Sequence, residues 1–278
     1  MAISTVNLRA ALLSVLLLVG LLGLWEFSVT VYAPEQRELT EYEILSGQGQ
    51  ARASVPPPSA VLVKAWNELS DPFHISGSND MGIGVQLGHS LYRVLAGFAM
   101  AAAVALPLGF LIGMSPIAYK ALNPFIQVLR PISPLAWMPL ALFVIRDAQA
   151  SAIFVIFICS IWPMLLNTAF GVAGVRQDWV NVARTHELGS LRTALTVILP
   201  AAAPTILTGM RISIGIAWLV IVAAEMLVGG TGIGYFVWNE WNNLDLTSVI
   251  FAILMIGVVG MVLDAIVAAF QRAVTYAE

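Results

Sequence analysis

The chain has 278 residues, of which 59% are hydrophobic and only 10% are charged, with a formal net charge of −3. Soluble domains carry about 25% charged residues, so this composition excludes a soluble globular protein. The mean hydropathy of +0.87 indicates an integral membrane protein. We therefore expect the lipid bilayer, and no nucleic acid, among its partners.

Six stretches are apolar enough to cross a bilayer as helices of about 20 residues. They lie near residues 8–32, 90–114, 122–145, 150–175, 203–228 and 247–271. Lipid leaves no water to satisfy an open strand edge, and the alternating pattern of an outer-membrane barrel is absent. The sequence therefore predicts an all-α membrane protein with six transmembrane helices, forming one transmembrane domain over 1–278.

The first apolar stretch runs from Ala10 to Val31 and is interrupted by Glu26. A secretory signal is the alternative, because Val31-Tyr32-Ala33 looks like a peptidase site. However, the stretch exceeds the roughly 7–15 residues of a signal core, and Pro34 would block cleavage. We interpret it as a retained first span.

The next segment, 33–89, is a large loop. Pro56-Pro57-Pro58 predicts a stiff spacer, and Ser59 is positioned to cap a short helix. Four apolar residues then recur at helical spacing, namely Leu62, Ala65, Trp66 and Leu69. They predict one apolar stripe that lies on the membrane surface or against the other spans.

Basic residues near span ends favour the cytoplasmic side. With the N-terminus inside, that side receives Arg9, Lys120, Arg176, Arg184, Arg192 and Arg272. The external loops then receive most of the acidic residues, namely Glu35, Glu38, Glu41, Glu43, Glu68, Asp71, Asp80, Glu240 and Asp245. This orientation makes both termini cytoplasmic, segment 33–89 external and segment 176–199 cytoplasmic.

The polar segment 176–199 separates two long apolar stretches. Pro200 lacks an amide hydrogen and disfavours helix at Leu199, so a short helix should end before the next span. An apolar ridge at helical spacing consists of Trp179, Val182, Ala183 and His186. Such a ridge can enter a groove of a soluble partner, although the residues alone also fit an ordinary amphipathic surface loop.

The spacing of this segment resembles the EAA loop of the permease subunits of bacterial ATP-binding-cassette importers. That pattern reads Glu-Ala-Ala, three residues, Gly, nine residues, Ile, one residue and Leu-Pro. The matching positions are Asn181-Val182-Ala183, Glu187, Val197 and Leu199-Pro200. Asn181 and Glu187 depart from the pattern.

Further stretches are similar to the nitrate, sulfonate, taurine and bicarbonate branch of those permeases. They are Ser90 to Phe98, Leu129 to Pro139, Ala223 to Leu227 and Gly260 to Asp264. Three segments look closest to nitrate and bicarbonate members, namely Leu135 to Pro139, Ile161-Trp162-Pro163 and Asn79 to Gly84. The resemblance covers the chain from about Pro57 to Phe270.

The resemblance implies a type I importer permease fold in the bacterial inner membrane. It also implies two ATPase subunits that hold ATP and Mg²⁺, a second copy of this chain and an external substrate-binding protein. The segment 176–199 would be the ATPase-coupling loop, with Asn181, Val182, Ala183, Arg184, Glu187, Leu188 and Gly189 as its candidate contacts.

No catalytic or cofactor site is predicted in the chain itself. It lacks the G-x-x-x-x-G-K-[ST] phosphate loop. Its three histidines, His74, His89 and His186, are scattered without ligands at metal-binding spacing. We therefore expect a transport subunit that is not an enzyme and contains no metal or cofactor of its own.

Candidate pathway residues are polar, charged or placed at helix breaks inside the spans. They are Arg130, Ser133, Trp137, Met138, Asn167, Arg211 and Glu225. Intramembrane charges are functional candidates by default. Arg130 and Arg211 would attract an anion toward the inner mouth, unless they snorkel or pair with carboxylates. Ser133 lies between two prolines that should break the helix, and Trp137 with Met138 could form a constriction. Glu225 and Asp264 fit helix packing better than anion contact.

These observations predict the permease of an ATP-driven, binding-protein-dependent importer of a small inorganic anion, with nitrate or nitrite first. Bicarbonate is the alternative substrate, followed by a sulfonate or taurine. A channel or an ion-coupled carrier is the alternative class, but no convincing repeat relates residues 1–140 to 141–278.

Overall fold

The computed structural model describes residues 5–31, 55–77 and 81–274, which are almost entirely helical. The N-terminal elements are α1 (Thr5–Val31), α3 (Pro58–Ser70) and α4 (Ile83–Met114), followed by α5 (Pro116–Leu129), α6 (Pro134–Ile145) and α7 (Ala148–Ala173). The short helices α8 (Gln177–Thr185) and α9 (Ser190–Thr193) and the π-helical turn η1 (Ala194–Ile198) precede α10 (Leu199–Val228), α11 (Ile233–Asn242) and α12 (Leu246–Val274). The prediction of an all-α membrane fold is confirmed.

Five helices of the described chain are long and apolar enough to cross a membrane, namely α1, α4, α7, α10 and α12. The predicted third span, 122–145, is not one straight helix. It is divided into α5 and α6, whose axes differ by 93°. Pro131 and Pro134 explain the break, because neither can donate a helical hydrogen bond. The sixth span exists only if this bent pair is counted as one.

Helix α7 lies between α4 and α10, and glycines permit its close contact with both. A Cβ added to Gly97 would come within 2.7 Å of Ile156, and one added to Gly109 within 2.6 Å of Thr168. Small residues let membrane helices approach in this way. Both contacts advance in the same direction along the two helices, so α4 and α7 are parallel. Helix α10 is antiparallel to α7, and its Gly209 contacts Asn167 of α7.

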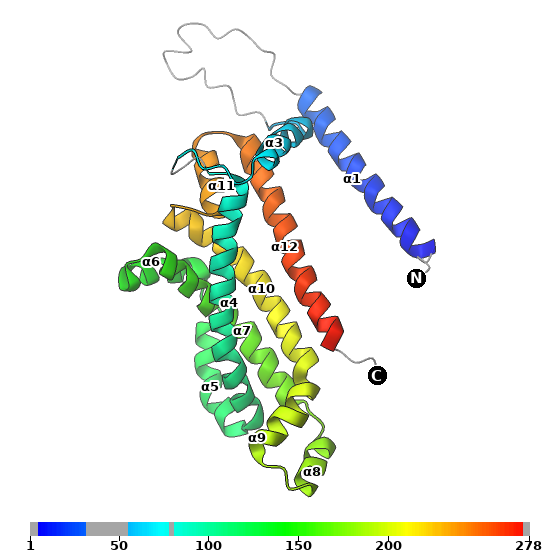
Figure 1. Ribbon diagram of the computed structural model, residues 1–278, viewed down its shortest axis with the longest axis vertical. Coiled ribbons are helices and arrows are strands. Elements are labelled where there is room, and N and C mark those ends of the chain that lie inside the picture. The colour runs from blue at the N-terminus through cyan, green and yellow to red at the C-terminus, as the bar shows by residue number, and fades with distance from the viewer. Residues whose placement is uncertain (1–4, 32–54, 78–80, 275–278) are drawn as a thin grey trace.

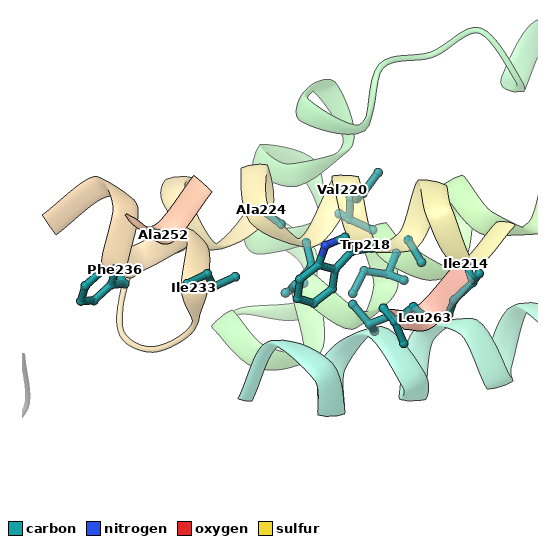
Figure 2. Packing of buried hydrophobic residues seen from close by; sticks show 14 of the residues in the cluster. Ile214, Trp218, Val220, Ala224, Ile233, Phe236, Ala252 and Leu263 are labelled. Carbon is teal, nitrogen blue, oxygen red and sulfur yellow. The ribbon is translucent and has the colours of Figure 1, made fainter. Parts of the chain in front are cut away.

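The largest apolar core fills the space between these helices. It contains Ile214, Trp218 and Ala224 from α10, Ile233 and Phe236 from α11, and Ala252 and Leu263 from α12 (Figure 2). The indole N–H of Trp218 donates a hydrogen bond to the Ile256 carbonyl at 2.9 Å. This core fixes α11 and α12 against α10.

Short helices mark the two ends of the bundle (Figure 1). We call the end with α8 and α9 the α8 end, and the opposite end, with α3 and α11, the α11 end. The beginning of α1 and the end of α12 are the ends of these helices that point away from the α11 end (Figure 1). Described basic residues at or near the α8 end include Lys120, Arg176 and Arg192, and described acidic residues at the α11 end include Glu68 and Asp245.

Helix α1 diverges from the other spans and meets them through α3 (Figure 1). The backbone N–H and hydroxyl of Ser59 donate to the Glu26 carboxylate at 3.1 and 2.9 Å. The prediction that Ser59 caps α3 is wrong, because the helix begins at Pro58 behind Pro57 and Ser59 already lies inside it.

The predicted apolar stripe of α3 is mostly exposed. Leu62, Trp66 and Leu69 are exposed, with Trp66 at 78%, whereas Ala65 packs against the core. Val61, which was not part of the predicted stripe, is buried. The stripe was expected to lie either on the membrane surface or against the other spans, and its exposed residues fit the membrane surface.

Helix α12 begins behind Asp245. The Asp245 carboxylate accepts hydrogen bonds from the Ser248 N–H at 3.1 Å and from the Ser248 hydroxyl at 2.6 Å. Burial acts to raise the pKa of Asp245, but the Ser248 hydrogen bonds and nearby Lys64 outweigh it and hold that pKa below its ordinary 3.8. The charged Asp245 therefore ties α12 to α3, which carries Lys64.

Candidate functional site

A cavity of about 510 Å³ lies where the break between α5 and α6 faces α7 and α10. Its lining includes Arg130, Trp137, Cys159, Trp162, Asn167 and Ile212. On α7 the lining runs from Ile158 to Phe170, which covers the middle of this helix and its half nearer the α8 end. The cavity therefore lies within the span and not at its mouth.

A second hollow of about 460 Å³ adjoins this cavity. The two share Leu166 and Phe170, and the second hollow extends to Ile112 and Ala173, close to the α8 end. Together they extend from Arg130 toward that end of the bundle.

Arg130 is placed by the broken helix. Its backbone N–H closes the last turn of α5 by donating to the Ile126 carbonyl at 3.0 Å. The side chain is exposed to the cavity, and no carboxylate of the described residues forms an ion pair with it. The sequence placed Arg130 near the inner end of its span. The structure places it deeper, because the span is divided at this point.

Three predicted pathway residues line this cavity together, namely Arg130, Trp137 and Asn167. The Asn167 amide donates to the Pro163 carbonyl at 2.8 Å, so one of its donors serves the helix itself. Trp162 and Cys159 also line the cavity and were missed as pathway residues. Cys159 lies four residues, about one helical turn, before Pro163, and Trp162 is next to Pro163, so their closeness to this proline on α7 was the available signal.

Ser133 and Met138 do not line the cavity. Ser133 is exposed at the N-cap position of α6 and accepts no capping hydrogen bond with its side chain. Met138 is only 1% exposed and belongs to the main apolar core. The predicted constriction of Trp137 with Met138 is therefore absent, because adjacent helical residues point in different directions.

Arg211 lies on α10 but pairs with α12. Its guanidinium donates to both carboxylate oxygens of Asp264, each at 2.6 Å. Arg211 is therefore paired with a carboxylate, which was the alternative interpretation of this residue. It is not an unpaired cation that could attract an anion. Both side chains remain about half exposed on the outer surface of α10 and α12.

Glu225 belongs to a buried network at the α11 end. Its side chain is 2% exposed and forms an ion pair with Arg93 at 2.6 Å. Ser90 donates to the same carboxylate at 2.8 Å, and the Gly234 backbone N–H donates to it at 3.0 Å. Glu225 therefore organises packing and does not touch the cavity, which corrects its inclusion among the pathway residues.

The same network holds the start of α11. Gln86 accepts from the Gly232 N–H at 2.6 Å, and Ser90 accepts from the Ile233 N–H at 2.9 Å. Arg93 also donates to the Thr231 carbonyl at 2.7 Å. Gln86, Ser90 and Arg93 share one face of α4 at helical spacing, so α4, α10 and α11 are joined through buried polar groups.

Arg93 was missed as an intramembrane charge, although a signal existed. Two stretches that carry the family resemblance, Ser90 to Phe98 and Ala223 to Leu227, contain Arg93 and Glu225 respectively. The pair is separated by 132 residues, and only the fold brings the two together.

Helix α8 presents an exposed ridge at its end of the bundle. Val182 is 59% exposed, and Trp179, Asn181, His186 and Glu187 are exposed as well. Ala183, by contrast, is 3% exposed and faces the protein interior. The prediction that Ala183 faces a partner is therefore wrong, because the helix turns Val180 and Ala183 inward and leaves Trp179 and Val182 outside.

The remaining candidate residues of the coupling loop, Glu187, Leu188 and Gly189, form the turn after α8. Glu187 N–H donates to the Arg184 carbonyl at 2.9 Å, and Leu188 N–H donates to the Ala183 carbonyl at 3.2 Å. This is the Schellman pattern, in which the residue after the C-cap is left-handed and usually glycine. Glu187 has φ +55°, which explains the glycine of the EAA pattern. Leu188 is half-buried, and Gly189 caps the start of α9.

Arg184 borders a small hollow of about 160 Å³ between α8 and the ends of α4 and α7. Within the described part of the chain, no three His, Cys, Asp or Glu side chains come together to hold a metal ion. The arrangement thus combines a cavity at a broken helix with an exposed amphipathic helix at one end of the spans. These features define a multi-span membrane permease.

Comparison with known proteins identifies the family. Residues 105–276 match the family described as "Binding-protein-dependent transport system inner membrane component". The chain belongs to this family of ATP-binding-cassette importer permeases.

The curated relatives include three proteins named nitrate import permease protein NrtB. The chain is 45% identical to the one from Synechocystis sp., over 86% of both chains. It is 48% identical to the one from Leptolyngbya laminosa, over 76% of this chain and 75% of the relative. The bicarbonate transport system permease protein CmpB of Synechocystis sp. is 40% identical over 83% of both chains.

The fold is similar to a solved structure. A chain of the inward-facing MetNI methionine ABC transporter aligns with a TM-score of 0.61 and 16% identity. The alignment covers 69% of this chain and 95% of that chain. This agreement shows a type I importer permease fold.

Proposed function

We propose that this chain is the permease subunit of an ATP-driven importer of a small inorganic anion, with nitrate or nitrite as its substrate. The choice of nitrate rests on the 42–48% sequence identity of this chain to three nitrate import permeases. The bicarbonate permeases, at 40–41% identity, make bicarbonate the second candidate. Sulfonates and taurine come third.

The exposed ridge of α8 supports coupling to ATPase subunits. Trp179 and Val182 are apolar side chains on the surface of a polar helix, and such a ridge suits a groove in a soluble partner. ATP and Mg²⁺ bind to those partners, and this chain supplies the moving pathway. A channel or an ion-coupled carrier would not need this surface.

The α8 end faces the cytoplasm in this proposal. The basic residues near the α8 end support it through the positive-inside rule. The α11 end then meets the external substrate-binding protein, both termini are cytoplasmic, and the complex resides in the bacterial inner membrane.

Two copies of the chain form the complex. The half-exposed pair of Arg211 and Asp264 supports this proposal, because charged groups within a span are costly against lipid. A second copy would cover this surface or enclose water beside it. Symmetric homodimers are also the commonest oligomers.

Uptake by reconstituted vesicles tests the proposed function. Vesicles that contain the permease and its ATPases should accumulate labelled nitrate only when ATP and the matching binding protein are both supplied. Accumulation of bicarbonate without nitrate would replace the substrate and retain the class. Accumulation without ATP would contradict the class, and native mass spectrometry with a single copy of this chain would exclude the homodimer.

A further inference from the structure

We infer that the cavity at the α5–α6 break contains an anion-binding site, in which Arg130, Trp137 and Trp162 supply N–H donors to a planar monoanion that only accepts hydrogen bonds. This inference deepens the proposed function, since nitrate and nitrite are such anions. It goes beyond a passive path, because it places substrate recognition inside the membrane.

The cavity is lined by donors that lack acceptors. Neither indole N–H, of Trp137 or of Trp162, donates to an acceptor among the described residues, and both residues line the cavity with Arg130. By contrast, the indole of Trp218 in the core has its carbonyl partner at 2.9 Å. A guanidinium can offer two parallel N–H groups to a planar oxyanion. Unmatched donors around one space favour an occupant that accepts only.

The net charge of the cavity is positive. The C-terminal end of α5 and the N-terminal end of α6 meet at the break, so their opposite partial charges largely offset one another. Described carboxylates within the spans are engaged elsewhere, Glu225 with Arg93 and Asp264 with Arg211, and Glu26 accepts from Ser59. The Arg130 guanidinium therefore remains the uncompensated charge.

The shape and chemistry of the lining select among anions. A volume of about 510 Å³ admits a small anion with part of its hydration shell, since each water takes about 30 Å³ in the liquid. Bicarbonate carries a hydroxyl donor that needs an acceptor. Among the lining side chains the Asn167 amide oxygen is the principal acceptor, against the N–H donors of Arg130, Trp137 and Trp162, so the lining offers more donors than acceptors. Sulfonates must also place an apolar or amine-bearing tail. Nitrate leaves no group of its own unmatched.

The single cysteine of the chain provides a direct test, because Cys159 lines this cavity. The assembled complex is treated with negatively and positively charged methanethiosulfonates of similar size, and modification of Cys159 is followed by mass spectrometry of this chain. The negatively charged reagent should react preferentially, and Arg130→Gln should reduce that preference by about tenfold or more, because a charged cleft concentrates counter-ions to this extent. Nitrate should slow the reaction at millimolar concentration, and taurine should not.

Matched variants distinguish anion binding in the cavity from a change in the overall charge of the protein. Arg272→Gln, which removes a cation from the last turn of α12 outside the cavity, should leave both the preference and the nitrate protection unchanged. Trp162→Leu should weaken protection without changing the charge preference. Ile212→Cys in a Cys159→Ser background supplies a second reporter from α10 and should show the same protection.

The outcomes are distinct from those of the uptake experiment. Equal reagent preference in wild type and Arg130→Gln would overturn the site, as would unchanged reaction rates in nitrate or no modification of either cysteine in any nucleotide state. If vesicles import bicarbonate but not nitrate while nitrate still protects Cys159, the proposed substrate fails and the anion site stands. Protection by bicarbonate alone would refute the selectivity argued from the donors.

Discussion

Neutralising Glu225 should strongly destabilise the α11 end of the permease. In Glu225→Gln the buried guanidinium of Arg93 loses the carboxylate that lies 2.6 Å away. Removing one partner of a buried ion pair costs about 3–5 kcal/mol, because the other charge remains buried without compensation. Ser90 and the Gly234 N–H can still bind the amide oxygen, so the loss should come from the charge and not from these donors.

A double-mutant cycle isolates the pair. Arg93→Met removes the charge and retains much of the side-chain volume, so the double variant Arg93→Met/Glu225→Gln contains no unpaired charge. Its destabilisation should be smaller than the sum of the single changes by about 2 kcal/mol, within the range for residues in direct contact. Unfolding free energies can be measured from tryptophan fluorescence in mixed micelles of dodecyl sulfate and maltoside.

Glu68→Gln is the matched control. Lys64 and Glu68 form an ion pair at 3.1 Å on one face of α3, and their side chains are 32% and 15% exposed. Water reaches this pair, so its loss should cost an amount nearer to the roughly 0.3–0.5 kcal/mol of an exposed i, i+4 pair than to the roughly 3–5 kcal/mol of a buried one. A Glu225→Gln protein as stable as the Glu68→Gln protein would refute the reasoning, and so would a double variant whose loss equals the sum of the single losses.

The remaining predictions concern α8 and the turn that follows it. Val182→Asp should leave the isolated permease folded but reduce co-purification of its ATPase by about tenfold, a loss of 1.4 kcal/mol, whereas Ala183→Asp should lower the melting temperature of the isolated permease because it buries an unpaired carboxylate. Normal ATPase recovery with Val182→Asp would show that this ridge is not the docking surface. Glu187→Gly should raise the melting temperature relative to Glu187→Ala, because a left-handed residue other than glycine costs about 1–2 kcal/mol. Equal melting temperatures for these two variants would contradict the strain assigned to φ +55°.

The sequence alone was sufficient to predict that the protein lies in a lipid bilayer, that its fold is all-α and that it belongs to the importer permeases. A bilayer forces backbone hydrogen bonds inside each span, so long apolar stretches are helices wherever they occur. Pro131 and Pro134 marked the place where the third span breaks, since a missing amide hydrogen acts locally. The polar segment before Pro200 predicted a short helix, α8, and its spacing led to the importer permeases. The helix break predicted at Leu199 is absent, because α8 already ends at Thr185 and one continuous helix runs from Ser190 through Pro200 to Val228. Proline is tolerated in the first turn of α10, where its missing N–H removes little.

Only the tertiary structure decided which charges are available. Arg130 and Arg211 were equivalent in the sequence, but helix packing pairs Arg211 with Asp264 and leaves Arg130 in a cavity without a carboxylate. The partners in each ion pair lie 53 or 132 residues apart, and no local pattern records such a pairing. The rotation of α8, which buries Ala183 and exposes Val182, depends in the same way on the surface against which the helix packs. Periodicity tells which residues share a face, but contacts with distant helices decide where that face points.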